Sequence, residues 1–366
     1  MFELHVLGTS SARFAHGRSV SGSVINTPGG LALIDCGEGM QNRVIMHNRN
    51  LKKSGRDNRT RLSRIRAIFL THGHLDHSWG VLPLLQTLNL DGRKNPLTII
   101  GPTTHEAMEW AKNHPGETPP IESDISPTDL AILFSQWQAI GAKDELSYTI
   151  NWVPIIIDRD LPFTCPEQPL DGVNVTILPT THGVPSCAYH FETQRKPRFN
   201  REKAEQLQLS DSQISRLASG ENIDHGGNDL RAEDFRSETR PNCSIVVSGD
   251  TAFGPPGFDI NHLPSPPNLL LHESTFTSEN QEKATQYFHS TATDAAKHAS
   301  KCKAGVLALT HYSSRIERLS PLVSEAREHF SGPVAATSDG DWFRVDSDGK
   351  VTHYVRIEEG WNQMIL

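Results

Sequence analysis

The feature that most constrains this chain is a cluster of metal-binding side chains directly after an apolar run. Residues 65–71 read IRAIFLT, the pattern of a buried β-strand, and residues 71–77 read THGHLDH. In an extended loop, side chains two positions apart point the same way, so His72 and His74 can hold one cation together. Asp76 and His77 follow at once and can serve a second cation. The sequence therefore predicts a metal site at a strand end.

Two divalent cations need more ligands than one loop supplies. Three further candidates each come just after an apolar run: His182 after 173–178, Asp250 after 244–247 and His311 after 305–310. Alone, each would be an ordinary loop residue more often than a ligand, but their shared placement favours the metal. Because a carboxylate can bridge two ions through its two oxygens, Asp250 suits a shared position.

Short β-type runs alternate with Gly, Ser and Pro breaks and with helix-like segments, which predicts an α/β fold. We expect strands at 2–7, 23–27, 31–34, 65–70, 97–100, 173–178, 244–247, 268–271, 305–310 and, as the last core strand, 342–345. Residues 27–30 (TPGG) predict a hairpin turn, and helices are expected after residue 39 and over 79–88. Residues 103–150 are mixed and Pro-rich, which we interpret as an insertion. Residues 193–241 hold nine basic and nine acidic residues and few large apolar ones, so they predict a polar arm, loop or hairpin without a core of its own.

Charge and cysteine content restrict the classes of protein. The formal net charge is −8, which is not that of a general nucleic-acid binder. Residues 49–66 nevertheless carry eight Lys/Arg against one Asp, either a solvated basic turn or a phosphate-contacting patch. The five cysteines are scattered and never in a CxxC pair, which argues against a disulfide framework and a zinc ribbon. With no signal-peptide pattern and no apolar run of about 18 residues, we expect a cytoplasmic protein without a membrane partner.

The motifs resemble one known family. The HxHxDH motif at 72–77, with His182, Asp250 and His311, resembles the ligand series of the metallo-β-lactamase fold. Within that superfamily the chain is most similar to ribonuclease Z, the endoribonucleases that remove 3′ trailers from tRNA precursors. The similarity covers most of the chain, and its more particular stretches are HST (289–291) and LTHYSSR (309–315).

The resemblance implies an αββα sandwich formed by the whole chain, 1–366, with two metal ions at one edge. One ion is expected on His72, His74, His182 and Asp250, and the other on Asp76, His77, Asp250 and His311. Zinc is expected, although manganese or iron also suit His/Asp ligands. Asp76 would also orient the attacking hydroxide, and His289 would act as general acid with Glu273 orienting it. Asp35 is expected to brace the metal loop without being a ligand, and Ser290 or Thr291 to cap the helix after His289. Relatives suggest a homodimer.

The chain departs from the family in two substrate-binding regions. The loop at 11–20 keeps Arg18 but lacks the usual Pro and Lys, and the arm, which begins with Lys196 and Arg198, lacks a Gly-Pro tip. These three residues and Arg315 are the predicted RNA contacts. A neutral arm should hold tRNA less tightly.

Two other function classes stay open. The neutral arm favours a small-molecule hydrolase on the same fold, such as a cyclic-nucleotide phosphodiesterase or an arylsulfatase- or lactonase-like enzyme. A non-catalytic RNA-binding descendant is the third class, and the complete ligand set speaks against it. The HST and LTHYSSR stretches and the basic stretch favour a ribonuclease acting on a tRNA precursor.

Overall fold

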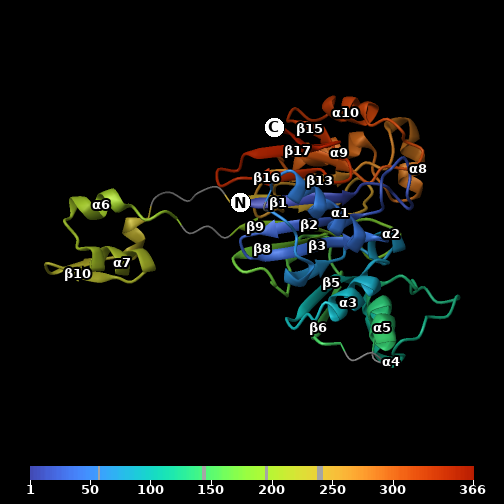
Figure 1. Ribbon diagram of the computed structural model, residues 1–366, viewed down its shortest axis with the longest axis horizontal. Helices are drawn as coiled ribbons and strands as arrows, with labels where there is room; N and C mark the ends of the chain where they lie inside the picture. The colour runs from blue at the N-terminus through green and yellow to red at the C-terminus, as the bar shows by residue number, and fades with distance from the viewer. Residues whose placement is uncertain (57, 142–145, 194–196, 237–241) are drawn as a thin grey trace. The chain divides into compact units, whose positions relative to one another are not determined.

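The computed structural model describes residues 1–56, 58–141, 146–193, 197–236 and 242–366. They form two compact units (Figure 1). Unit 1 comprises Met1–Glu192 and Cys243–Leu366, and unit 2 comprises Thr193–Asn242.

Unit 1 contains two β-sheets. The strands of the first sheet are β1 Phe2–Gly8, β2 Gly22–Thr27, β3 Gly30–Cys36, β4 Ile65–Phe69, β5 Leu97–Thr103, β6 Ile150–Ile156, β16 Trp342–Val345, β17 Val351–Ile357 and β18 Gly360–Ile365. Their order across the sheet is β18-β17-β16-β1-β2-β3-β4-β5-β6. The strands of the second sheet are β7 Phe163–Thr164, β8 Val173–Pro179, β9 Cys187–Thr193, β12 Ser244–Val247, β13 Leu269–Glu273, β14 Val306–Thr310 and β15 Val334–Ala336. Their order is β15-β14-β13-β12-β9-β8-β7.

The alternation of side chains along the strands separates three apolar layers. In β4, Ala67 and Phe69 belong to the core between the two sheets, whereas Ile68 between them belongs to the layer under the first group of helices. β14 divides in the same way, with Val306 and Ala308 in the central core and Leu307 and Leu309 under the second group. Both faces of these two strands are therefore largely buried, which explains why they read as nearly continuous apolar runs.

Helices cover the outer faces of both sheets (Figure 1). The helices in the N-terminal half are α1 Met40–Lys53, α2 Leu75–Ser78, α3 Val81–Leu90, α4 His105–Asn113 and α5 Leu130–Gly141. Those in the C-terminal half are α8 Gln281–Gln286, α9 Ala292–Lys301 and α10 Ser320–Arg327. Short 3-10 helices lie at η1 Leu62–Arg64, η3 Pro256–Phe258 and η4 Ser278–Asn280. The predicted α/β class and the αββα layering are confirmed.

All the predicted strands are present, but the predictions missed β9, which is buried in the middle of the second sheet, and the edge strands β6, β7 and β15. The hairpin at 27–30 is confirmed, because Thr27 pairs with Gly30 across a two-residue turn. The strand at 342–345 was expected to be the last one, but β17 and β18 follow it and extend the same sheet. Val351 and Tyr354 of β17 are buried, so this extension is part of the folded unit.

Residues 103–150 pack closely against the rest of unit 1. They include α4 and α5, and Leu130, Phe134 and Trp137 belong to the apolar layer over the first sheet. The carbonyl oxygen of Thr128 lies so close to Gly73 that a Cβ there would come within 1.7 Å of it. The segment thus presses on the loop between His72 and His74, where only glycine fits. Whether it is an insertion relative to other proteins stays a prediction.

Unit 2 has a small core, contrary to the expectation that the polar segment could not form one. It consists of α6 Arg201–Gln206, α7 Asp211–Ser219, the hairpin β10 Ile223–His225 and β11 Asn228–Leu230, and η2 Ala232–Phe235. Its buried apolar residues are Ala204, Leu209, Leu217, Ile223, Ala232 and Phe235. A few well-placed apolar residues, two of them alanines, are enough to close so small a cluster.

All five cysteines are buried and none forms a disulfide, as expected for a chain without a disulfide framework. Within the described ranges, no helix combines the length and the apolar character needed to cross a membrane.

Candidate metal centre

The predicted ligands converge at one edge of unit 1. Four lie on the loop and short helix that follow β4, one on the loop between β8 and β9, one after β12 and one after β14. Because β12, β13 and β14 are parallel, their carboxyl ends share one edge, and the metal loop after β4 of the other sheet meets them there.

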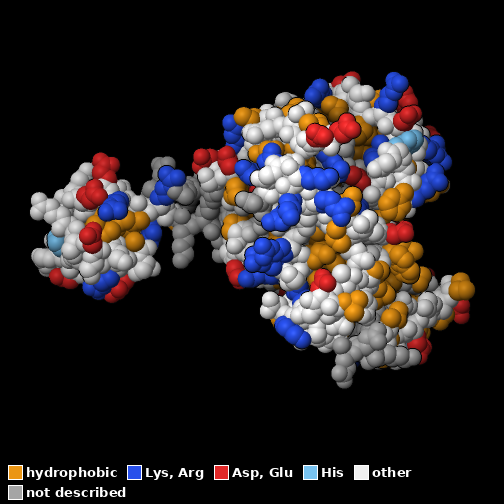
Figure 2. Space-filling view, in the orientation of Figure 1, with side chains coloured by type: hydrophobic (Ala, Val, Ile, Leu, Met, Phe, Trp, Pro, Cys, Tyr) orange, Lys and Arg blue, Asp and Glu red, His pale blue; other side chains and the backbone are white. Residues whose placement is uncertain are grey.

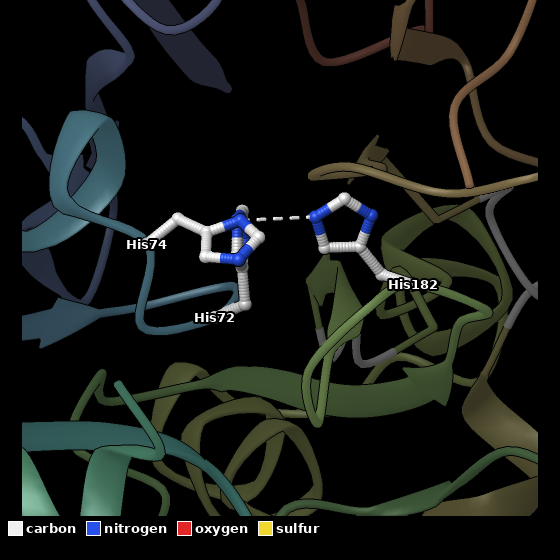
Figure 3. Close-up of side chains that lie close together, drawn as sticks. All are labelled: His72, His74 and His182. Carbon is white, nitrogen blue, oxygen red and sulfur yellow. Dashed lines mark hydrogen bonds between the residues drawn. The ribbon is translucent and has the colours of Figure 1, made fainter. Parts of the chain in front are cut away.

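Three histidines form the first group (Figure 3). His72 Nε2 lies 3.1 Å from His74 Nδ1, and His182 Nε2 lies 3.1 Å from the same His74 atom. The close-up shows the three rings pointing toward one another from the loops after β4 and β8. Their nitrogens are close enough together to ligate one cation.

The second group combines a carboxylate with two histidines. His77 Nε2 lies 3.1 Å from His311 Nε2, and Asp76 Oδ2 lies 3.5 Å from His311 Nε2 and 3.7 Å from His77 Nε2. The backbone N–H of Ala12 donates to Asp76 Oδ2 at 2.7 Å and fixes that carboxylate from the loop after β1.

Asp250 stands between the two groups. Its Oδ2 lies 3.7 Å from His72 Nε2 and 3.9 Å from His182 Nε2. Its Oδ1 lies 3.3 Å from both His77 Nε2 and His311 Nε2. Each oxygen thus faces a different group of histidines, which is the arrangement that a carboxylate bridging two cations requires.

Outer contacts fix the imidazoles from behind. Asp35 Oδ2 contacts His77 Nδ1 at 2.7 Å, and Asp35 Oδ1 accepts the backbone N–H of Thr71 at 2.8 Å. The hydroxyl of Thr275 lies 3.0 Å from His311 Nδ1. A hydrogen bond at Nδ1 leaves Nε2 directed into the site, as is usual for histidines that bind metals. The bracing contacts predicted for Asp35 are present.

The protonation of the site follows from burial and from its carboxylates. Burial, helped by neighbouring imidazoles, lowers the pKa of His72 well below its usual value and that of His74 to about 4. Burial also lowers the pKa of His182. Burial alone would lower the pKa of His77 too, but nearby carboxylates, that of Asp250 first, raise it well above its usual value. The three histidines of the first group are therefore neutral and offer lone pairs to a cation. In the second group, the carboxylates around His77 favour a positive charge at that position.

The residues fit a pair of divalent cations. Asp250 is buried, yet its Oδ1 has no hydrogen-bond partner among the described residues. A buried carboxylate oxygen without a partner is costly unless a cation approaches it. Imidazole and carboxylate donors of this kind suit zinc, manganese or iron.

His289 lies at the border of this centre. Its Nδ1 is 3.0 Å from Glu273 Oε1 and 3.8 Å from Asp250 Oδ2. Burial alone would lower the pKa of His289, but Glu273, with help from other carboxylates, raises it to about 9. Thr291, one of the two predicted capping residues, caps α9 directly after this histidine.

The predicted RNA contacts are spread over both units. Arg18 is buried, and its guanidinium donates to the carbonyls of Ile316 and Glu317, so it braces the loop after His311 and has little free surface for a substrate. Arg315 lies exposed on that same loop. Arg198 is exposed in unit 2, and Lys196 falls outside the described residues.

Sequence reasoning predicted Asp35 and Glu273 as outer partners but missed two others, Thr275 and the carbonyl of Phe288. Thr275 has no distinguishing pattern around it, although it falls within the LHESTF stretch at 271–276. The carbonyl of Phe288, which lies 2.9 Å from His182 Nδ1, carries no signal at all because every residue has a carbonyl.

The two facing sheets and the histidine–aspartate centre at their edge define a protein of the metallo-β-lactamase fold. The model of the metallo-beta-lactamase superfamily matches residues 17–189. The ribonuclease Z of Myxococcus xanthus is 30% identical over 344 residues, covering 93% of this chain and 96% of that protein. The ribonuclease Z of Methanosarcina acetivorans is 31% identical over 340 residues, with coverages of 92% and 96%. The chain therefore belongs to the ribonuclease Z family.

A solved structure agrees at the level of the fold. The crystal structure of human tRNase Z, short form, superposes with a TM-score of 0.57 at 20% sequence identity and covers 94% of this chain and 99% of its own.

Proposed function

We propose that this protein is a metal-dependent endoribonuclease that removes 3′ trailers from tRNA precursors. Asp250 supports the proposal most directly, because its two oxygens face two separate groups of histidines. Membership of the ribonuclease Z family supplies the substrate class. We further propose that the resident metal is zinc, that the enzyme is a homodimer, and that it acts in the cytoplasm, for which five cysteines without a disulfide are suited.

The divalent ions, when bound, supply Lewis acidity at the scissile phosphate and lower the pKa of water in the site. Asp76 Oδ2, fixed by the N–H of Ala12, orients the attacking water. On the other side, His289 donates a proton to the departing sugar oxygen, which is otherwise a poor leaving group. Glu273 keeps His289 charged and oriented. The two side chains are in direct contact, with His289 Nδ1 3.0 Å from Glu273 Oε1.

Cleavage of a 3′-extended tRNA precursor by the purified, metal-loaded protein tests the function, with Asp76→Ala as the blank. We expect cutting directly after the tRNA body, lost in the variant. If an activated phosphodiester is hydrolysed but the precursor stays intact, the centre is active and the enzyme is instead a small-molecule hydrolase. Metal analysis of the protein as purified, with reconstitution of the chelated protein by zinc, manganese or iron, tests the metal.

The leaving group distinguishes the role of His289. His289→Ala should slow cleavage of RNA by roughly 10²- to 10⁴-fold, the usual contribution of a general acid. Hydrolysis of bis(p-nitrophenyl) phosphate should change little, because nitrophenolate leaves without a proton. Equal losses on both substrates would mean that His289 supports the metal site instead.

A further inference from the structure

Exposed aromatic side chains gather around the metal centre. Five are exposed in the part of the chain that the structure describes, namely Phe14, Trp79, Phe253, Tyr287 and Phe288. Each lies on a segment that carries the site: the loop that contacts Asp76, the end of α2, the loop after Asp250 and the two residues before His289. Figure 2 shows hydrophobic side chains at the surface beside α2. Exposed aromatic residues confined to the surroundings of one site indicate a ligand with flat apolar faces.

Phe288 is held in an unfavourable backbone conformation. Its φ is 55°, in the left-handed region, at the position after the C-cap of α8 where glycine is the usual residue. For a bulky residue this conformation costs about 1–2 kcal/mol. The carbonyl of Phe288 contacts His182 Nδ1, while the residue as a whole is 43% exposed. The backbone thus serves the metal site, and the ring is left free beside it.

Phe253 carries a second exposed ring, and two lysines accompany it. One face stacks on His298, with ring centroids 4.9 Å apart and planes 18° from parallel. The ammonium groups of Lys301 and Lys297 lie 4.7 Å and 5.7 Å from the centroid.

The two rings border the same loop. The N–H of Ala252 donates to the carbonyl of Thr181 at 2.8 Å, which places the Phe253 loop against the loop of His182. Phe288 contacts His182 itself. Both phenylalanines therefore flank the segment that brings one ligand to the centre.

An aromatic face beside ammonium groups has the chemistry of a nucleotide subsite. Bases of single-stranded RNA stack on aromatic side chains, and phosphates pair with nearby cations. We propose that Phe253 and Phe288, with Lys297 and Lys301, form a subsite that stacks an unpaired nucleotide next to the scissile phosphodiester. The subsite rests on the proposed ribonuclease function. If it is present, the enzyme prefers to cut RNA at positions where at least one of the two nucleotides flanking the cut is unpaired.

The experiment couples a change in the RNA to a change in the protein. A short single-stranded RNA and a 3′-extended tRNA precursor are each prepared intact and with an abasic residue at either nucleotide flanking the cut. Binding of the short RNA and single-turnover cleavage of the precursor are measured for the wild-type protein, Phe253→Leu, Phe288→Leu and Lys297→Ala/Lys301→Ala. The matched controls are Ile365→Ala and Lys350→Ala, both exposed and on β18 or the turn before β17.

For the wild-type protein, one of the two abasic positions should weaken binding of the short RNA roughly tenfold and raise the protein concentration that half-saturates single-turnover cleavage by a similar factor. Phe253→Leu and Phe288→Leu should each weaken binding of the intact RNA by about the same factor. For these variants, the abasic RNA should bind little more weakly than the intact RNA. The lysine variant should weaken both RNAs alike, and the controls should match the wild type. If the abasic RNA and the Leu substitution each weaken binding and their effects multiply, the ring and the base do not contact each other and the subsite is overturned. The same holds if Phe253→Leu and Phe288→Leu change the oligomeric state of the protein but not its affinity for RNA.

The two hypotheses fail in different ways. Coupled binding without cleavage leaves the subsite standing and overturns the proposed function. Cleavage without coupling supports the proposed function and overturns the subsite. If the protein neither binds nor cleaves RNA, both hypotheses are overturned.

Discussion

Asp35 shows how far a single residue outside the ligand set controls the centre. Its carboxylate contacts both His77 and the backbone of Thr71, so it orients a ligand and fixes the metal loop together. Asp35→Asn should lower metal affinity about 10- to 100-fold, as loss of such partners usually does. Asn tolerates the left-handed backbone at this position, where φ is 57°, so the fold should persist. Competition with a chelator measures the affinity. An affinity equal to that of the exposed control Asp171→Asn would show that the contact is dispensable.

Glu3, at the start of β1, forms an acid-sensitive ion pair with Arg344. Burial favours its neutral form, but contacts with His5, Asn58 and Arg344 outweigh burial and lower the pKa to about 2. In the unfolded chain the value is near 4.5. The folded carboxylate therefore contributes stability that is fully present above pH 4.5 and is lost as the pH falls toward 2.

We expect Glu3→Gln to lower the free energy of unfolding by about 2–3 kcal/mol at pH 7, with a difference that shrinks toward zero near pH 2. Denaturant unfolding of the metal-free proteins between pH 7 and pH 2 measures it. Asp171→Asn, which removes an exposed ion pair, should change stability little at any pH. If the difference in unfolding free energy between Glu3→Gln and the wild type does not change with pH, the substitution acts through packing and not through loss of the charge.

At the residue scale, the sequence predicts ligands better than it predicts their supports. The candidate ligands could be identified because each histidine or aspartate directly follows a run of apolar residues, and the ends of such strands meet. Their supports are contacts between distant segments. Ala12, for example, acts through its backbone, and 64 positions separate it from Asp76. Only the fold brings such pairs together.

At the scale of elements, strands that read as apolar runs were predictable, whereas β9, which is buried but reads CAYHFET, and the exposed β18 were not. β4 and β14 are short apolar runs with clear bounds. β18, which reads GWNQMI, is mostly exposed and polar enough to pass for a tail. Unit 2 was missed for a related reason, since its core depends on Ala204 and Ala232, residues that carry little hydrophobic signal.

Helix α9 connects stability to the site through its cap. Thr291 and Asp294 form a capping box directly after His289 and Ser290. Thr291→Ala should cost about 1 kcal/mol of stability and also slow RNA cleavage, because the loop that positions His289 loses its anchor. Ser210→Ala is the matched control, since it removes the same kind of cap from α7 in unit 2. Unfolding curves and single-turnover rates are compared. If both variants slow cleavage equally, the cap of α9 has no special link to the site.

For the whole molecule, the described residues of unit 1 include a group of arginines without ion-pair partners, whereas several arginines of unit 2 are paired. In unit 2, Arg201 pairs with Glu205 and Arg216 with Glu221. In unit 1, a cavity of about 810 Å³ is lined by several arginines, of which Arg59, Arg61 and Arg64 form no ion pair with any described residue. Lys and Arg side chains are indeed gathered over β1 to β3 and α1 in Figure 2. This cavity lies at the start of β4 and the metal loop at its end, about 17 Å apart, a span that a folded RNA bridges.

The salt dependence of RNA binding therefore distinguishes phosphate contacts made by unit 1 from those made by unit 2. Replacing Arg59, Arg61 and Arg64 by Ala should reduce the slope of log K against log salt by about 2–3, because each lost phosphate contact removes close to one. Unit 2 can be deleted by joining β9 to β12 with a short turn, since Glu192 and Ser244 pair across these neighbouring antiparallel strands. That deletion should weaken binding of a tRNA precursor but reduce the slope by less than the arginine replacement does, since two contacts, Lys196 and Arg198, are predicted there against three arginines in unit 1. Hydrolysis of bis(p-nitrophenyl) phosphate should persist in both variants and shows that the centre is intact. A larger change of slope on deletion than on arginine replacement would place the main phosphate contacts in unit 2.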